Sequence, residues 1–364
     1  MRRARAAAVI LAAVTPFVLV GCASGHGDDP ELGALLDRVV TAGAPGVLVV
    51  VREDGNVRSE ARGFADRSLS SRMRADERFR IGSITKTFVA TLVLRLAEDG
   101  ALGLDDTVER WLPGLVPGGQ AITVRHLLAH TAGLFDYVED DRIFSDRERR
   151  WSPRELVSLA TAHLPEGSPP GQTYAYSSTN YIVLGLIAEE AGGAPLGRQL
   201  RERLFEPLGL RHTSFVPGGI RGRHVHGYRP PSHQGIVTGP PVDISDEPAW
   251  WAWAAGGIVS TAADLQRFFA ALLRGRVLGP TLLREMETLR PAGRFEYGLG
   301  IFTFPTPCGP AWGHTGNAQG TITVAWNTRD ASRQLVLVVN TYPLSAELEK
   351  AVLRVRDAAF CSAA

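Results

Sequence analysis

Lysine is nearly absent from this chain of 364 residues. Of its 39 Lys and Arg residues, only Lys86 and Lys350 are lysine. Basic and acidic residues almost balance, at 39 against 38, and no long run of basic residues occurs. Phosphate backbones need a concentrated positive surface, so nucleic acid is excluded as an expected partner. Because lysine is so rare in this arginine-rich chain, the position of each lysine can indicate a function that arginine could not serve.

Long hydrophobic runs are also lacking outside the N-terminus. There, three arginines among the first five residues precede an apolar run over 6–20, which is shorter than the ~20 residues of a spanning helix. This pattern predicts a signal peptide over 1–21. The stretch Leu-Val-Gly-Cys ending at Cys22 resembles a bacterial lipobox, with a polar tether over 22–31. We expect lipidation of Cys22 and an extracytoplasmic protein held at the outer face of the cell membrane only by its lipid. The alternative is an ordinary cleaved signal with an incidental cysteine.

Cysteine is scarce, with three in the whole chain. If Cys22 carries lipid, Cys308 and Cys361 remain as an even pair in an oxidising compartment. A disulfide between them would stabilise the fold by up to roughly 4 kcal/mol in the chain-entropy model. Two free buried thiols are the alternative.

Strand and helix signals alternate near the N-terminus. A helix is expected over 31–42 from its apolar spacing. The β-branched run 47–51 is followed by Asp54-Gly55 and a return segment, which together predict a hairpin. A buried helix is expected from Ser83 to a glycine terminator at Gly100.

The middle of the chain is mostly helical in pattern, and the C-terminal part returns to strands. Capping patterns at Ser152 and Thr261 mark helix starts. The simplest fold is α+β, with one antiparallel sheet built from N- and C-terminal strands, flanked by helices. A mostly helical subdomain over about 104–255 is inserted within a single domain over 32–364. The C-terminal elements expected are strands at 297–304, 311–316, 321–326 and 335–340 and a helix over 345–360.

Ser83-Ile84-Thr85-Lys86 is the first candidate site. Helix positions three apart share a face, so hydroxyl and amine can meet. Serine is a weak nucleophile until a base takes its proton. Lysine accepts that proton only while uncharged, a form that burial favours, whereas arginine stays protonated. The alternative is a helix N-cap followed by a solvated lysine.

Two further candidate sites lie downstream. Tyr176-Ser177-Ser178 precedes a predicted helix, and His314-Thr315-Gly316 lies on a predicted strand. A glycine after Thr315 lets a substrate approach the backbone closely. Taken singly, the first is more typical of a capping cluster with core tyrosines, and the second of a strand-end turn.

Together, the three motifs in this order resemble those of the serine β-lactamase and penicillin-binding superfamily. The closest likeness is to the D-alanyl-D-alanine carboxypeptidase branch that resembles class C β-lactamases, in which His-Thr-Gly replaces Lys-Thr-Gly. The likeness covers about residues 32–361, and that branch joins the pair matching Cys308 and Cys361. Supporting stretches are found at 79–83, 126–134 and 297–300.

The resemblance implies a role for each motif. Ser83 becomes acylated, Lys86 and Tyr176 take and return its proton, and His314 completes the hydrogen-bonded cluster. The backbone N–H groups of Ser83 and Asn317 form an oxyanion hole, each worth about 10²- to 10³-fold in rate.

The substrate-binding residues implied are Ser178, Trp251, Thr315 and Gly316. Thr315 faces the substrate carboxylate, and Trp251 forms an aromatic wall. No metal or organic cofactor is expected, because the histidines at 126, 130 and 314 have no carboxylate or thiolate at ligand spacing. His130 is expected to be a structural hydrogen-bonding residue.

Two departures from the family pattern bear on the substrate. Ser178 stands where the family usually has Asn, and Phe302 stands where the carboxypeptidase branch has an Arg that binds the terminal carboxylate. Losing such a bidentate contact weakens selection for a free carboxylate.

We therefore expect a serine acyl-enzyme hydrolase, similar to D-alanyl-D-alanine carboxypeptidases. It would act as a monomer on peptidoglycan stem peptides or another small acyl donor, and react with β-lactams. The alternatives are an esterase or β-lactamase of the same fold, a penicillin-binding lipoprotein without turnover, and a structural envelope protein. Ser83, Lys86 and Tyr176 together argue against the last two, since neither needs them.

Overall fold

The computed structural model describes residues 30–146, 149–163, 169–233 and 236–361. The predicted signal peptide, Cys22 and most of the predicted tether lie outside the described residues. Residues 30 and 31, which we assigned to the tether, already belong to α1 (Pro30–Thr41). Within these ranges, no helix combines the length and apolarity needed to cross a bilayer.

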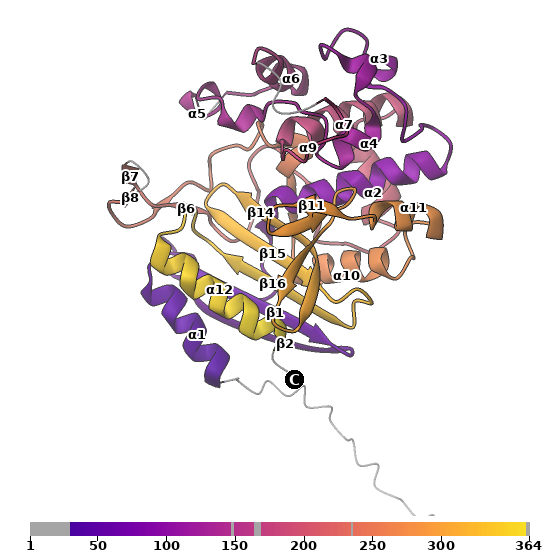
Figure 1. Cartoon of the computed structure of the whole chain (residues 1–364). Coiled ribbons are helices and arrows are strands. Elements are labelled where there is room, and N and C mark those ends of the chain that lie inside the picture. The colour runs from indigo at the N-terminus through magenta and orange to yellow at the C-terminus, as the bar shows by residue number, and fades with distance from the viewer. Residues whose placement is uncertain (1–29, 147–148, 164–168, 234–235, 362–364) are drawn as a thin grey trace, which may run out of the picture.

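An antiparallel sheet of nine strands forms the centre of the molecule, in the order β11-β12-β13-β14-β15-β16-β1-β2-β3 (Figure 1). The first strand of the chain therefore pairs with the last one, β16, and with β2. This arrangement confirms the expected α+β fold with a sheet from both ends of the chain. The strands are β1 (Gly46–Glu53), β2 (Asn56–Asp66), β3 (Ser71–Arg72), β11 (Arg290–Ala292), β12 (Phe295–Tyr297), β13 (Phe302–Thr306), β14 (Gly309–Ala318), β15 (Thr321–Asn327) and β16 (Arg333–Val339).

Two helices, α1 and α12 (Ala346–Cys361), lie side by side on one face of the sheet (Figure 1). Successive strand residues point to opposite faces. Val47 and Val49 of β1 accordingly belong to the core cluster beneath these helices, whereas Leu48 and Val50 belong to the larger cluster on the other face. A central strand buried on both faces reads as a continuous apolar run, which is why 47–51 has no polar alternation.

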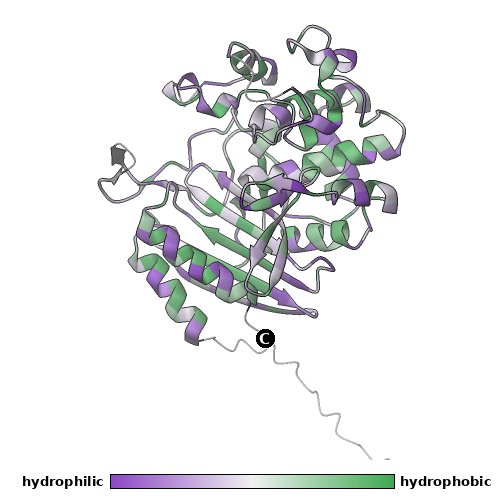
Figure 2. Ribbon diagram, viewed as in Figure 1, coloured by the Kyte–Doolittle hydropathy of each residue, from purple (hydrophilic) through white to green (hydrophobic). Residues whose placement is uncertain are grey.

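The other face of the sheet carries the larger core and the helix that follows the nucleophile. α2 is buried along almost its whole length and packs against α7, and Figure 2 shows both as largely hydrophobic. Burial on all sides explains why α2 lacks a polar stripe. The longer helices on this side are α2 (Thr85–Glu98), α6 (Pro153–Thr161), α7 (Ser178–Gly192), α10 (Ala262–Leu273) and α11 (Pro280–Met286).

The middle of the chain contains many short helices and two- or three-residue strands; in Figure 1 the helices lie above the sheet, and β6, β7 and β8 project to its left. The short strands include a small sheet of β4, β10 and β5, which connects this part to the start of α2. These elements are β4 (Phe79–Arg80), η1 (Gly82–Ile84), α3 (Val108–Trp111), η2 (Gly119–Ala121), α4 (Val124–Leu128), η3 (Tyr137–Glu139), α5 (Arg142–Ser145), α8 (Leu196–Leu200), η4 (Arg201–Phe205), β5 (Ser214–Phe215), β6 (Tyr228–Arg229), β7 (Ser232–His233), β8 (Ile236–Val237), β9 (Val242–Asp243), α9 (Trp253–Gly256) and β10 (Ile258–Ser260).

The prediction of one continuous strand over 297–304 is wrong, because the chain turns back within this stretch. β12 ends at Tyr297 and β13 begins at Phe302, with a tight turn closed by a hydrogen bond from Gly298 N to Ile301 O. Gly300 has a φ of +82°, and a Cβ there would lie 2.3 Å from the Cβ of Ala90. The glycines in this stretch thus form the turn and allow it to pack on α2, and they are not part of a strand.

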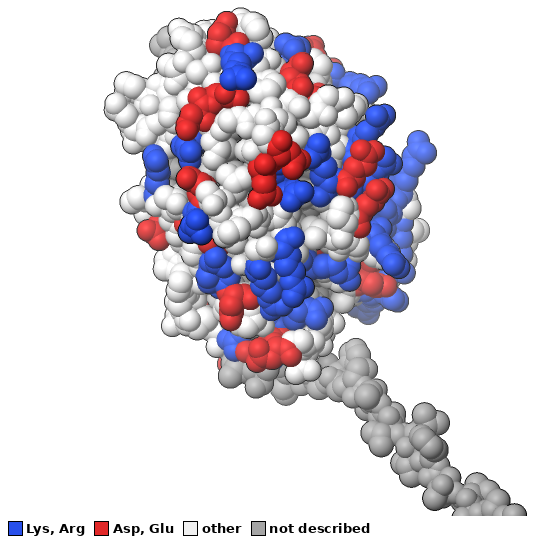
Figure 3. Space-filling view, turned by 90° about the vertical axis from the view of Figure 1, so that its right-hand side faces the viewer, with Lys and Arg blue, Asp and Glu red and all other residues white. Residues whose placement is uncertain are grey.

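The surface carries charges of both signs. Figure 3 shows basic and acidic side chains distributed together over one face. Many arginines form ion pairs, such as Arg125 with Glu285 and Arg203 with Asp99, each at 2.6 Å. Exposed pairs of this kind contribute little stability individually. Because each places a negative group beside an arginine, they break up any large positive patch on the surface.

Candidate active site

Ser83 and Lys86 are brought together by a change of helix type. Ser83 lies in the 3₁₀ turn η1, not in the α-helix itself, and Lys86 lies in the first turn of α2. Lys86 Nζ donates to Ser83 Oγ at 3.1 Å and to the carbonyl O of Ala255 at 3.2 Å. Lys86 is fully buried, and within the described residues no carboxylate lies at ion-pair distance from it. A buried amine without a counter-ion is the setting in which lysine acts as a base.

The backbone around Ser83 fits closely against β14. A Cβ added to Gly82, whose φ is +52°, would lie 2.5 Å from the carbonyl O of Asn317, and one added to Gly316 would lie 1.9 Å from that of Ile81. Only glycine permits this approach from either side. The backbones of Ser83 and Asn317, which the sequence analysis assigns to the oxyanion hole, are therefore neighbours, and both residues line the same cavity.

Ser178 is the first residue of α7, and its side chain reaches the same centre. Its Oγ lies 3.5 Å from Lys86 Nζ, and the residue is buried. The family position that usually carries an amide therefore holds a hydroxyl that faces the lysine. A hydroxyl both donates and accepts, but it is shorter than an asparagine amide.

Tyr176 lies beside this centre with its ring over the lysine. Lys86 Nζ is 4.9 Å from the centroid of the Tyr176 ring. The side chain is 37% exposed, and its hydroxyl makes no hydrogen bond with any residue that the structure describes. Its hydroxyl is thus available to a substrate at the cavity.

His314 is hydrogen-bonded differently from what we expected. Its Nδ1 donates to the carbonyl O of Thr315, and its Nε2 accepts from the hydroxyl of Tyr297 at 3.2 Å. Among the described residues, it makes no hydrogen bond to Ser83, Lys86 or Tyr176. Burial, together with the positive charge of Lys86, lowers the pKa of His314 to about 3, against the opposing effect of the Thr315 carbonyl. The neutral ring therefore forms part of an aromatic layer behind the lysine.

Ser83 opens onto a cavity of about 500 Å³. A smaller hollow of about 30 Å³ lies next to it and is lined by Lys86 as well. Trp251 lies at the wall of both, edge-on to Phe144 at a centroid distance of 5.3 Å. Thr315 and Gly316 are not among the residues lining either space, although Gly316 holds the backbone against Ser83. The lining of the larger cavity combines aromatic and aliphatic side chains with a few polar groups, as small-molecule sites usually do.

The basic residues that line these two spaces are all engaged. Arg229 donates to both carboxylate oxygens of Glu247, at 3.2 and 2.9 Å. Arg80 donates to two backbone carbonyls and is nearly fully buried, and burial lowers its pKa to about 10. Lys86 faces the nucleophile. Hence no guanidinium or ammonium among the described lining residues is left for a substrate carboxylate.

A carboxyl group also lines the larger cavity. Burial raises the pKa of Asp136, although the charge of Lys86 and N–H groups of Ser178 and Val138 act in the opposite direction. Phe302 lies outside the cavity lining, buried against the ring of His314 at 5.0 Å. The polar groups of the cavity wall therefore include a carboxyl group, that of Asp136, as well as neutral side chains.

Two residues of this site were not recognised as part of it from the sequence. Tyr297 belongs to the family-like stretch 297–300 and begins an expected strand, but the sequence did not predict its hydrogen bond to His314. His130 was expected to be structural, and it is fully buried with its ring tilted against that of Tyr176, the ring centroids 4.3 Å apart. The spacing in the sequence carries no signal for either contact, because both depend on distant elements.

A disulfide joins Cys308 and Cys361, as expected. It connects the turn between β13 and β14 to the end of α12, so it ties the strand that carries His314 to a helix on the opposite face of the sheet. The link lies away from Ser83 and contributes to the framework rather than to the chemistry.

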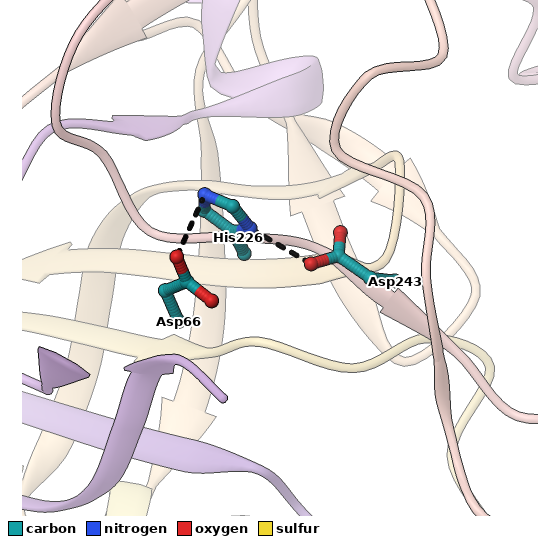
Figure 4. A group of neighbouring side chains, drawn as sticks. All are labelled: Asp66, His226 and Asp243. Atoms are coloured by element: carbon teal, nitrogen blue, oxygen red, sulfur yellow. Dashed lines mark hydrogen bonds and ion pairs between the residues drawn. The ribbon is translucent and has the colours of Figure 1, made fainter. Parts of the chain in front are cut away.

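Asp66, His226 and Asp243 form the one group in the described residues whose side chains could together hold a metal ion. Figure 4 shows the imidazole between the two carboxylates, with Nδ1 2.8 Å from Asp243 and Nε2 3.7 Å from Asp66. The second oxygen of each carboxylate accepts hydrogen bonds from a neighbouring serine. Since each ring nitrogen already faces its own carboxylate, the geometry favours a clamp in which His226 links the end of β2 to β9.

Comparison with known proteins identifies the family of the chain. The family profile described as Beta-lactamase matches residues 32–360. The structure superposes on that of a D-stereospecific amidohydrolase from Streptomyces sp. with a TM-score of 0.82 and 33% identity, covering 93% of this chain and 100% of that one. Esterase EstB of Burkholderia gladioli is 31% identical over 73% of each chain. Penicillin-binding protein 4 of Amycolatopsis lactamdurans is 33% identical over 62% of this chain, which spans only 58% of that protein's length.

Proposed function

The chain belongs to the serine β-lactamase and penicillin-binding superfamily, and on this premise we propose that it hydrolyses amides or esters of small acyl donors through an acyl-enzyme at Ser83. Amides and esters of D-amino acids with a free amino group are the proposed substrate class. The observation that carries the proposal is the 3.1 Å hydrogen bond between Lys86 Nζ and Ser83 Oγ, at a cavity and with the lysine fully buried.

In the proposed reaction, Ser83 Oγ forms a bond to the substrate carbonyl carbon while its proton passes to the Lys86 and Tyr176 pair. The backbone N–H groups of Ser83 and Asn317 stabilise the negative oxygen. The bond to the leaving group then breaks, and the proton passes to the departing amine or alkoxide. Water enters, gives its proton to the same pair, and releases the acid, after which Ser83 regains its proton.

The charges of the cavity support this substrate class. A terminal carboxylate is usually bound by a guanidinium or ammonium group, but the basic side chains lining the cavity are engaged with Glu247, with backbone or with Ser83. Asp136, by contrast, offers a carboxyl group that a substrate ammonium would favour in its charged form. Similarity to a D-stereospecific amidohydrolase supports the same class.

D-alanyl-D-alanine carboxypeptidase activity is the second candidate. It is favoured by the order of the three motifs and by the likeness to a penicillin-binding protein. It would require the Arg229 and Glu247 pair to open, or Thr315 to bind the carboxylate without a cationic partner.

The two candidates are separated by a direct comparison of substrates. The purified protein would be given D-phenylalanine amide, p-nitrophenyl acetate and a peptide ending in D-Ala-D-Ala, with L-phenylalanine amide as the stereochemical control and Ser83→Ala as the catalytic control. We expect Ser83-dependent release of ammonia and nitrophenol, with kcat/KM for the dipeptide substrate at least about tenfold lower. Preferred release of D-alanine would establish the carboxypeptidase instead. Steady covalent labelling of Ser83→Ala by penicillin would overturn the assignment of the nucleophile.

The proposed place of this activity is the outer face of the membrane, through a lipid on Cys22. The disulfide between Cys308 and Cys361 supports an oxidising compartment. Cell fractionation provides the test, since Cys22→Ser should move the protein from the membrane to the soluble extracytoplasmic fraction. An unchanged membrane fraction would contradict the lipid anchor.

A further inference from the structure

We propose that His130 is a positioning residue that holds Tyr176 in place for proton transfer. The inference rests on the proposed function, because Tyr176 is assigned there to move the proton together with Lys86. Tyr176 needs such support, since its side chain is partly exposed and its hydroxyl has no hydrogen bond to the described residues. Its position must come from the backbone and from ring contacts.

His130 holds the backbone on both sides of Tyr176. Its carbonyl O accepts the N–H of Ala175 at 2.8 Å, and its Nδ1 accepts the N–H of Ser177 at 3.2 Å. The rings of His130 and Tyr176 are then 4.3 Å apart at their centroids, with planes inclined by 34°. One residue thus fixes the preceding peptide, the following peptide and the ring of Tyr176.

The protonation state of His130 follows from its partners. The backbone N–H of Ser177 can only donate, so Nδ1 carries the lone pair, and Asn180 Nδ2 approaches the same atom at 3.0 Å. The ring proton is therefore on Nε2, which is buried with no hydrogen-bond partner in the part of the chain that the structure describes. Burial, together with the positive charge of Lys86, lowers the pKa of His130 well below its usual range. The ring stays neutral, which avoids a second positive charge beside Lys86.

His130 lies at the point where the chain leaves α4 and turns toward the segment 175–177. Its φ is +54°, in the left-handed region that residues other than glycine seldom adopt. Such a conformation costs of order 1 kcal/mol or more and persists where the surroundings require it. At this φ the carbonyl and the imidazole of one residue both reach the segment 175–177. The same conformation closes the C-terminus of α4, where the N–H of His130 donates to Leu127 O and that of Thr131 to His126 O.

Two substitutions separate the two contacts that His130 makes. His130→Asn keeps an acceptor for the N–H of Ser177 and removes the stacked ring, whereas His130→Phe keeps a ring and removes the acceptor. His126→Ala is the matched control, because His126 lies on the preceding helix α4, where its side chain accepts the N–H of Thr123 in a capping box. That change lowers stability without touching Tyr176.

The measurement is the rate constant for acylation of Ser83 by a fluorescent penicillin, per mole of folded protein, as a function of pH. We expect both His130 variants to be acylated about 10- to 100-fold more slowly, as misplacement of a reacting group by about 1 Å would cause, with a shifted pH profile and little change in ligand affinity. His126→Ala should be acylated at the wild-type rate. If one His130 variant fails to fold, the other still decides the question.

Acylation of folded His130→Asn or His130→Phe at the wild-type rate and with the wild-type pH profile would overturn the positioning role and leave the proposed function intact. A wild-type protein that is not acylated at Ser83 would instead overturn the proposed function, and the role of His130 with it. The two failures are thus distinguished by the wild-type reaction alone.

Discussion

His314 and His226 show the same side chain in two opposite environments. His314 is 2% exposed and hydrogen-bonded to a tyrosine and a backbone carbonyl, and burial lowers its pKa to about 3. His226 lies between the carboxylates of Asp66 and Asp243 (Figure 4). Behind the nucleophile, therefore, the protein keeps its histidines neutral by burial away from carboxylates. In the clamp, one imidazole faces two carboxylates and so links three segments of the chain.

The two regions are connected through the chain. His226 immediately precedes β6, which carries Arg229, and Asp243 in β9 is followed closely by Glu247. Arg229 and Glu247 both line the cavity in front of Ser83. The clamp thus lies next to the segments that form one wall of the cavity in front of Ser83. Acid and salt should consequently affect the wall and the catalytic centre in different ways.

Ser83→Ala tests the catalytic side of this comparison and should have the largest effect. Removal of the nucleophile is expected to lower turnover by at least about 10³-fold and to abolish covalent labelling by penicillin. Asp243→Asn in the clamp should keep kcat within a few-fold of wild type. Steady-state rates and labelling of the two variants give the measurement, and a similar loss in both would contradict the separation of the two regions.

His314→Gln tests whether burial keeps this histidine neutral. The unfolded chain binds a proton at a pH of about 6.5, whereas folded His314 does so at about 3. Between these two pKa values the unfolded state binds more protons than the folded state. The contribution of neutral His314 to the free energy of unfolding is therefore complete above the unfolded pKa of about 6.5 and is lost as the pH falls toward 3. Wild type should therefore lose up to roughly 4 kcal/mol more than His314→Gln between pH 7 and pH 3. Urea unfolding over this range gives the values, and parallel curves would refute the neutral state.

Glu247→Gln moves an unpaired positive charge into the cavity by releasing Arg229. We expect kcat/KM for a peptide ending in a free carboxylate to rise by about 5- to 10-fold, since a charge-assisted hydrogen bond is worth about 1.5–3 kcal/mol before competition with water. The rate with D-phenylalanine amide should fall or stay the same. The ratio of the two rates is the readout, and a rise for both substrates would point to a wider cavity rather than to charge.

Asp243→Asn weakens the clamp and should have the smallest effect on stability. Burial acts to raise the pKa of Asp243, but hydrogen bonds from Ser245 and His226 outweigh it and lower that pKa. Its stabilisation is therefore present above the usual carboxyl pKa of about 3.9 and is lost as the pH falls through the lowered value. Because the side chain is 37% exposed, we expect about 0.5–1 kcal/mol at pH 7.

The difference between Asp243→Asn and wild type should shrink with added salt and disappear as the pH falls through the lowered pKa of Asp243. Thermal unfolding at two salt concentrations provides the measurement. A difference that is independent of salt and pH would indicate a packing role for Asp243.

The sequence allowed the catalytic centre to be predicted better than its surroundings. Ser83 and Lys86 are local neighbours, so their contact follows from a spacing of three residues in a helical turn. The contact of Tyr297 with His314 depends on the pairing of β12, β13 and β14, which places Tyr297 opposite Phe302 and Phe302 opposite Gly313. No local pattern encodes that register, and the glycines at the turn were taken as part of a strand.

The clamp could not be predicted for the same reason. Asp66 lies far from His226 in the sequence, and the intervening chain forms most of the helical region. Each of its carboxylates also has a local role in a turn with a nearby serine, which is the ordinary interpretation of Asp followed by Ser two residues later. The imidazole that joins the two turns is visible only once the chain has folded.

The pairing of β1 with β16 sets the order in which the protein can become active. β1 lies between β16 and β2 in the sheet. It is paired with β16, although β1 is near the start of the chain and β16 is near its end. During synthesis, the first strand must wait for almost the whole chain before its second neighbour exists, and contacts of such long separation form slowly. Ser83 is made early, but β14, whose backbone lies against it, arrives only with the last fifth of the chain. A nascent or truncated chain consequently carries its nucleophile without the strand that completes the site.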